Sequence, residues 1–132
     1  MFQVKNKLEQ ANQKIYEECL NYYSNLIQCA KKIVVEELLE KANNGHTSVG
    51  LTIIPKKNHI DVIYGGDNTH SYDLSKEDCV TPQVPKHYCG NMSYPHRKNL
   101  ESAINSKVKK LYDIDIDVSM SVYNSLYFNA KW

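Results

Sequence analysis

Four side chains that can bind a metal ion follow one another in the middle of the sequence. They are Cys79, His87, Cys89 and His96, with the spacing Cys-x7-His-x-Cys-x6-His. Two thiolates and two imidazoles satisfy the tetrahedral preference of Zn²⁺. However, the spacing matches none of the usual zinc signatures and contains no Cys-x2-Cys pair. Unligated side chains, or a contact between Cys79 and Cys89, are the competing interpretation.

These residues belong to the segment 65–96, which has no sustained hydrophobic period and holds three of the four prolines. Connecting segments of this length are usually functional or disordered. The segment and its edges combine rigid aromatic with adaptable polar side chains, which suits recognition of a protein or a small ligand. The candidate binding residues are Tyr64, His70, Tyr72, His87, Tyr88, Asn91, Tyr94 and Arg97. The competing interpretation is an ordered excursion that covers an edge of the sheet.

Patterns typical of catalysis are weak elsewhere. Asp113, Asp115 and Asp117 alternate along one predicted strand, but neighbours on one strand face lie about 6.5 to 7 Å apart, too far to share one Mg²⁺. A solvated edge strand is the favoured interpretation. No Gly-x-Ser-x-Gly motif or phosphate-binding glycine loop occurs. We expect no catalytic residue and no cofactor, the alternative being a small metal-dependent hydrolase or nucleotide-processing enzyme that uses His and Cys of residues 65–96.

A long N-terminal helix must position much of this chain, because residues 2–44 contain neither Gly nor Pro. Apolar or small residues recur every three or four positions: Val4, Leu8, Ala11, Ile15, Cys19, Tyr22, Leu26, Ala30 and Ile33. Gly45 is expected to end the helix in a left-handed conformation. A continuous helix of about 40 residues would be roughly 60 Å long. It must overhang, break near residues 21–24 or Gln28, or pack on another chain, and we expect it to assemble a homo-oligomer.

A two-residue period follows the helix and predicts a β-hairpin. Ile53 would pair with Val62 and Leu51 with Tyr64, around either a turn at residues 57–58 or a loop at 56–59. Residues 97–112 then show a helical period, with Pro95 suited to the first turn. The apolar positions of this predicted helix are Leu100, Ile104, Val108 and Leu111.

The last segment, residues 114–132, has apolar side chains at even positions and polar ones at odd positions. This alternation predicts a second hairpin with a loop at residues 123–125. The predicted pairs are Val122 with Leu126, Met120 with Phe128, Val118 with Ala130, Ile116 with Trp132, and Asp117 with Lys131.

The charge balance limits the classes of partner. The 16 basic and 15 acidic side chains give a net charge of +1, and Arg97 is the sole arginine. Nucleic acid is therefore disfavoured as a partner, because planar bidentate phosphate recognition has one candidate residue. We see no signal peptide or membrane span, so we expect a cytoplasmic protein with free thiols and no membrane partner. Amino acids with AT-rich codons dominate, which favours a phage or viral gene and hence host cytoplasm or virion.

Together these patterns predict a single α+β domain over residues 1–132. A long N-terminal helix, a β-hairpin, a long irregular loop, a shorter amphipathic helix and a C-terminal β-hairpin would form a mainly antiparallel sheet with helices on one face. Residues 1–44 would be the oligomerisation element, and residues 65–96 the binding surface. The expected function is that of a non-enzymatic, oligomeric binding protein that recognises a protein or small ligand.

Overall fold

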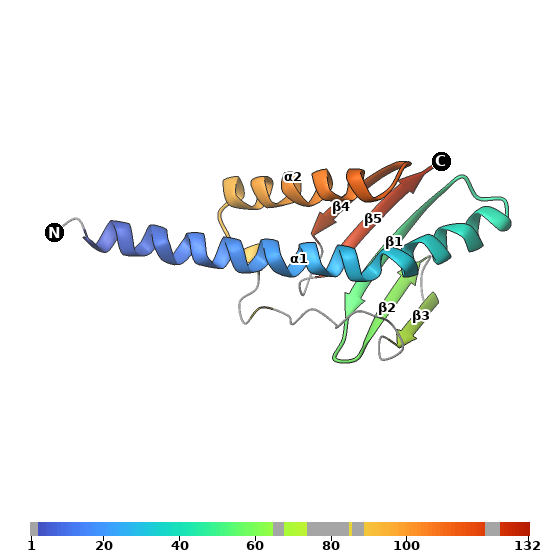
Figure 1. The fold of residues 1–132 in the computed structure, drawn as a ribbon, viewed down its shortest axis with the longest axis horizontal. Helices are drawn as coiled ribbons and strands as arrows, with labels where there is room; N and C mark the ends of the chain where they lie inside the picture. The colour runs from blue at the N-terminus through green and yellow to red at the C-terminus, as the bar shows by residue number, and fades with distance from the viewer. Residues whose placement is uncertain (1–2, 65–67, 74–84, 86–88, 121–124) are drawn as a thin grey trace.

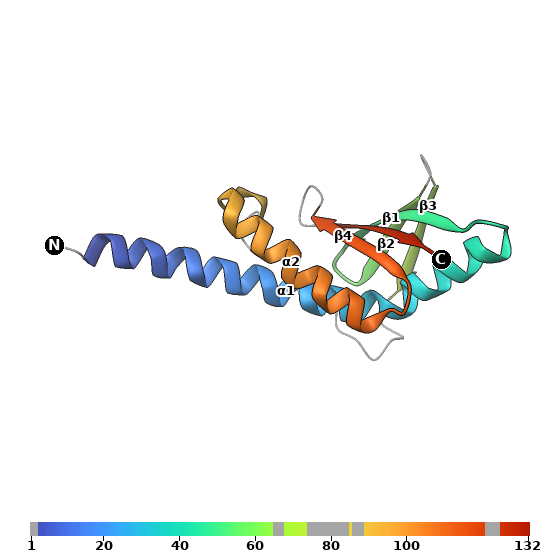
Figure 2. The same ribbon diagram turned by 90° about the horizontal axis from the view of Figure 1, so that it is seen from above.

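A computed structural model describes residues 3–64, 68–73, 85, 89–120 and 125–132 of the chain. Five strands form one sheet in the order β3-β2-β1-β5-β4, and every neighbouring pair is antiparallel. The helices pack on this sheet, so the predicted α+β class is confirmed (Figure 1, Figure 2). The elements are α1 (Gln3–Asn43), β1 (Ser48–Pro55), β2 (His59–Tyr64), β3 (Asn68–Asp73), η2 (Cys89–Asn91), α2 (Tyr94–Leu111), β4 (Asp115–Met120) and β5 (Leu126–Lys131).

Helix α1 is continuous, and the break considered near residues 21–24 or Gln28 does not occur. It ends as predicted, because Gly45 has a φ of +92° and the backbone N–H of His46 donates to the Lys41 carbonyl at 3.0 Å. A residue with a Cβ would be strained at this φ, which explains why glycine ends the helix. None of the described helices is long and apolar enough to cross a membrane.

The apolar stripe of α1 divides into two parts with different surroundings. From Cys19 onward its members are buried in the core of the chain, including Tyr22, Leu26, Ala30 and Ile33. Residues 3–14 are exposed throughout, with Val4 67% and Leu8 61% exposed. Both views show this end of α1 extending beyond α2 and the sheet (Figure 1, Figure 2). Of the alternatives for a helix of this length, the structure shows an overhang.

The hairpin of β1 and β2 has the predicted pairing of Ile53 with Val62. The Lys56 N–H donates to the His59 carbonyl at 2.8 Å, which leaves residues 57–58 at the turn. The same sheet contains a strand that was not predicted, because β3 pairs with β2 along its whole length. Its sequence, NTHSYD, is polar and shows no apolar alternation. Residues 65–96 therefore do not form a wholly irregular loop.

The C-terminal hairpin has the predicted faces but a different register. Met120 pairs with Leu126 and Val118 with Phe128, so each partner lies two residues earlier than predicted. Lys131 correspondingly faces Asp115 instead of Asp117. A shift of two residues keeps every side chain on the same face, so hydrophobic alternation cannot distinguish the two registers. Predicted pairings at Val122 and the predicted loop lie partly outside the described residues.

Helix α2 begins three residues earlier than predicted, with Pro95 in its first turn. It buries Leu100, Ile104 and Val108 as expected. Its polar Asn105 is fastened to the edge strand β4: the side-chain N–H donates to the Val118 carbonyl at 2.8 Å, and the Val118 N–H donates to Oδ1 at 2.7 Å. The side chain thus pairs with the strand as a neighbouring backbone would.

A disulfide joins Cys19 of α1 to Cys89 of η2, with their Cα atoms 6.0 Å apart. Cys29 is also disulfide-bonded. The expectation of free thiols is therefore wrong for these three cysteines. The fourth, Cys79, lies outside the described residues.

Candidate functional site

A buried carboxylate lies where the second half of α1 crosses the far edge of the sheet. Glu37 is 0% exposed, although it carries a formal charge. Its Oε1 atom accepts a hydrogen bond from the Tyr72 hydroxyl and lies 2.8 Å from His70 Nδ1. Both partners are on β3, so this cluster fastens the edge strand to the helix. Burying a charge is costly unless it is paired, and these contacts supply part of the pairing.

The local sequence explains how these groups meet. Glu37 follows Ile33 by four residues and therefore lies on the buried face of α1. His70 and Tyr72 are two residues apart on β3, which places both on one face of the sheet. In the sheet register His70 pairs with Val62 and Tyr72 pairs with Ile60, both buried residues of β2.

Tyr64 of β2 also contacts the imidazole ring of His70. Its hydroxyl lies 2.7 Å from His70 Nε2, and the two rings meet edge to face with centroids 5.0 Å apart. The Lys41 ammonium lies over the Tyr64 ring at 3.7 Å from its centroid, within cation–π range. His70 is thus held between a tyrosine hydroxyl and a buried carboxylate, yet its side chain remains 42% exposed.

The electrostatics of the cluster keep both tyrosines protonated. Burial raises the pKa of Tyr72, and its hydrogen bond to Glu37 together with the negative charges of Glu37, Glu36 and Glu40 raises it further. The pKa of Tyr64 is also raised, by desolvation first and then by the charges of Glu37 and Glu40. Both hydroxyls therefore remain available as hydrogen-bond donors at neutral pH.

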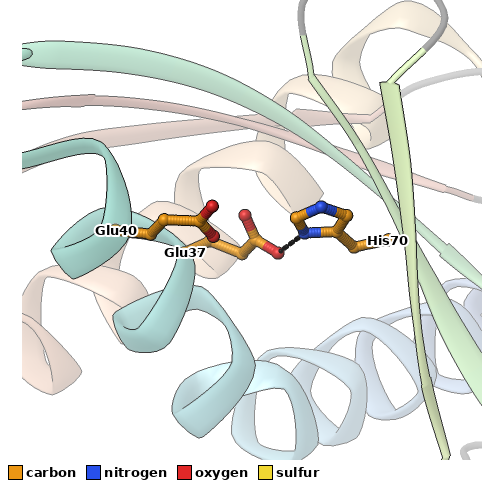
Figure 3. Close-up of side chains that lie close together, drawn as sticks. All are labelled: Glu37, Glu40 and His70. Carbon is orange, nitrogen blue, oxygen red and sulfur yellow. Dashed lines mark hydrogen bonds and ion pairs between the residues drawn. The ribbon is translucent and has the colours of Figure 1, made fainter. Parts of the chain in front are cut away.

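One atom of the cluster is left unsatisfied. The second carboxylate oxygen of Glu37, Oε2, is buried and has no hydrogen-bond partner among the described residues. Glu40 lies one helical turn away, and ligand atoms of Glu37, Glu40 and His70 all lie within 4.8 Å of one another. Figure 3 shows the two carboxylates and the imidazole directed toward one another from α1 and β3. Such a group has the donor atoms to hold a cation.

The binding residues predicted from the sequence lie in separate places in the structure. Tyr64, His70 and Tyr72 converge around Glu37. Three others lie near the start of α2, away from that cluster, where Tyr94 is 63% exposed: Asn91, Tyr94 and Arg97. His87 and Tyr88 lie outside the described residues. Sequence reasoning missed Glu37 itself, although an acidic residue in phase with the buried stripe of a helix is a detectable signal.

The zinc site considered at Cys79, His87, Cys89 and His96 loses a ligand. Cys89 is bonded to Cys19 and offers no thiolate. His96 Nδ1 lies 2.7 Å from the Ser93 hydroxyl at the start of α2. Asp113, Asp115 and Asp117 are all exposed, as expected for a solvated strand face.

Comparison with known proteins adds no assignment, because the chain matches no family model, no curated protein and no solved structure. The geometry described above is therefore the basis of the functional argument.

Proposed function

We propose that this protein is a non-enzymatic binding protein that assembles with a second copy of itself through residues 3–14 of α1. The observation that carries the proposal is that this part of the helix is exposed on all sides and still carries the apolar residues Val4 and Leu8. Isolated helices shorter than about 12 to 15 residues are marginal in water. Contact with a partner would stabilise this helical end by covering its apolar side.

The remainder of the stripe is not available to a partner. Cys19, Tyr22 and Leu26 are buried against the rest of the chain. Ile15 is partly buried and lies at the boundary between the two parts. The contact surface offered to a second copy therefore consists of the side chains near Val4, Leu8 and Ala11, extended by the edge of Ile15.

The charges near this surface favour an antiparallel pair of copies. In that arrangement Leu8 of one copy packs against Ile15 of the other, and the two helical segments run in opposite directions. The basic end of one segment, with Lys5 and Lys7, then lies at the level of the acidic end of the other, with Glu17 and Glu18. Two-fold symmetry between the copies gives the same pairing of basic with acidic side chains at both ends of the contact. The net charge of +1 adds little long-range repulsion between copies.

The oligomeric state tests this proposal, and light scattering coupled to size-exclusion chromatography measures it directly. The wild-type chain is expected to elute with the mass of a dimer. Leu8→Asp places a charge in the proposed interface and is expected to give the mass of a monomer. Asn6→Asp adds the same charge on the opposite side of the helix, because two residues span about 200°, and is expected to stay dimeric.

Two results would overturn the proposal: a monomeric wild type at 100 µM protein, about a hundredfold above a micromolar dissociation constant, or a dimer that Leu8→Asp leaves intact. Circular dichroism of both variants shows that the fold is retained, since Leu8 contributes nothing to the buried core.

The disulfide bears on where such a protein works. Disulfides persist in oxidising environments and are rare in the cytosol, where thiols are kept reduced. Cys19 and Cys89 are fully buried as well as bonded. We therefore propose an oxidising compartment or an extracellular location in place of the cytoplasm expected from the sequence. Alkylation of the protein from its native source, followed by mass spectrometry, tests this: alkylated Cys19 and Cys89 would contradict it.

A further inference from the structure

We propose that Glu37, Glu40 and His70 form a binding site for one divalent transition-metal ion, with Zn²⁺ as the representative cation. This site is separate from the exposed end of α1 and does not depend on the proposed assembly. It uses two carboxylates from one helix face and one imidazole from the adjacent edge strand (Figure 3).

One oxygen of Glu37 is left unsatisfied. Within the described part of the chain, Oε2 is buried without a hydrogen-bond partner, while Oε1 lies between Tyr72 and His70. A buried acceptor that makes no hydrogen bond costs about 1 to 3 kcal/mol, and more when it is charged. In Figure 3 this oxygen points into the space between Glu40 and His70. A cation placed there would receive an electron pair from Oε2 and remove that cost.

The local charge also favours a bound cation. Glu37 and Glu40 bring two carboxylates together, and in the described part of the chain neither forms an ion pair with a lysine or arginine. Lys41 is the nearest candidate on the same helix, but its ammonium lies over the Tyr64 ring. Among the residues that the structure describes, His70 is the sole group in an ion-pair geometry with Glu37. A dication would neutralise both carboxylates.

The two ring nitrogens of His70 are held by different groups. A histidine that binds a metal through one ring nitrogen usually donates the N–H of the other to an oxygen, which fixes its tautomer. Here Nε2 lies 2.7 Å from the Tyr64 hydroxyl, while Nδ1 faces Glu37. In the metal-free chain the Nδ1 proton faces Oε1 of Glu37, because a carboxylate oxygen only accepts. An ion bound at Nδ1 would replace this contact, with the imidazole proton then on Nε2 and donated to the Tyr64 oxygen.

The donor set selects the class of metal. Imidazole suits Zn²⁺ and its neighbours in the first transition row, whereas Ca²⁺ and Mg²⁺ prefer oxygen ligands alone. Tetrahedral Zn²⁺ with bonds of about 2.0 to 2.1 Å needs ligand atoms roughly 3.4 Å apart. The atoms lie within 4.8 Å of one another, and the exposed Glu40 side chain can close the remaining gap by rotation. A fourth position stays open on the side where His70 is exposed.

Titration calorimetry of the oxidised protein with ZnCl₂, and separately with MgCl₂, tests the site. Oxidation matters because Cys19, Cys29 and Cys89 then offer no thiolate. The expected result is one Zn²⁺ per chain and an affinity for Mg²⁺ at least a hundredfold weaker. Addition of Zn²⁺ is also expected to raise the melting temperature, because the ion binds the folded chain in preference to the unfolded one.

Matched variants locate the binding. Glu40→Gln and His70→Asn are expected to weaken Zn²⁺ binding at least tenfold, and both side chains are exposed enough for the chain to fold without them. Glu36→Gln, a neighbouring exposed glutamate, and His96→Asn, a histidine outside the cluster, are expected to leave the affinity unchanged. Tyr64→Phe should weaken binding by about 10- to 100-fold through loss of the hydrogen bond to His70.

Replacement of Zn²⁺ by Co²⁺ supplies an independent readout, because the visible absorption of bound Co²⁺ reports its coordination. A tetrahedral spectrum that disappears in His70→Asn and persists in His96→Asn supports the site. Absence of saturable Zn²⁺ binding, or equal losses in the site and control variants, would overturn it.

Discussion

The bond between Cys19 and Cys89 fixes the start of α2 against the middle of α1, across a separation of 70 residues. Cys19 is the first fully buried residue along α1, so the bond lies at the point where the helix leaves the body of the chain. It divides α1 into a packed part and an exposed part. Helix α2 begins five residues after Cys89 and packs beside α1.

Loss of this disulfide is expected to lower the free energy of unfolding substantially. Closing a loop of this length removes chain entropy from the unfolded state worth about 4 kcal/mol at 25 °C. The double variant Cys19→Ser, Cys89→Ser should therefore unfold at lower urea concentration than the wild type. Dithiothreitol should shift the midpoint of the wild type downward and change that of a variant without disulfides very little.

The hydrogen bonds by which Asn105 joins α2 to β4 give a second prediction. Asn105→Ala removes both hydrogen bonds to the Val118 backbone, and also the one that Nδ2 donates to the Glu101 carbonyl at 2.9 Å. Leaving the Val118 backbone groups unpaired in this half-buried position should lower the free energy of unfolding by about 2 kcal/mol. The measurement is urea unfolding followed by circular dichroism.

Ser102→Ala, on the same helix, is the control for this variant and should change the free energy of unfolding by less than about 0.5 kcal/mol. Faster amide exchange at Val118 in Asn105→Ala would locate the effect at the edge strand. An unchanged exchange rate would show that the side chain does not hold the strand.

The elements whose period is regular could be predicted from the sequence. The unbroken stripe from Val4 to Ile33 predicted α1, Gly45 marked its end, and the alternation at Ile53 and Val62 set the first hairpin correctly. The C-terminal register could not be predicted, because a shift of two residues keeps the same face buried. Strand β3 was missed because its stability comes from pairing with β2 and from contacts to α1, neither of which leaves an apolar pattern.

The candidate site, like the fold, could be predicted from the sequence only in part. The residue types predicted Tyr64, His70 and Tyr72 as binding residues. The sequence does not indicate that His70 and Tyr72 contact Glu37, because these contacts join residues more than 30 positions apart. The pairing of Cys19 with Cys89 depends likewise on how α1 packs. The sequence alone favoured free thiols, and the packing of the helix brings Cys19 and Cys89 together instead.

The contact between Tyr72 and Glu37 gives a third prediction. Tyr72→Phe removes a donor from a fully buried carboxylate and should lower the free energy of unfolding by about 1 to 3 kcal/mol. Tyr94→Phe alters an exposed tyrosine and should have no measurable effect. In a double-mutant cycle with Glu37→Leu, the loss caused by Tyr72→Phe should largely disappear, because the buried acceptor is then absent.

The last prediction concerns Tyr112, whose hydroxyl is buried without a hydrogen-bond partner among the described residues. Burial raises the pKa of Tyr112, and the pKa of Tyr22 is raised for the same reason. In the unfolded chain a tyrosine ionises near pH 10. Above that pH the unfolded state binds fewer protons than the folded state, so the free energy of unfolding should fall as the pH rises. Below pH 10 these two tyrosines should contribute no pH dependence.

Tyr112→Phe separates this contribution from other alkaline effects. The variant removes a buried hydroxyl that has no partner, so at pH 7 it should be as stable as the wild type or more stable by up to about 1 kcal/mol. Its stability should also fall less steeply between pH 10 and pH 11, because one fewer tyrosine ionises on unfolding. Urea unfolding at pH 7, 9, 10 and 11 measures both effects. A variant that is markedly less stable at pH 7, or that has the same alkaline slope as the wild type, would show that the hydroxyl has a partner.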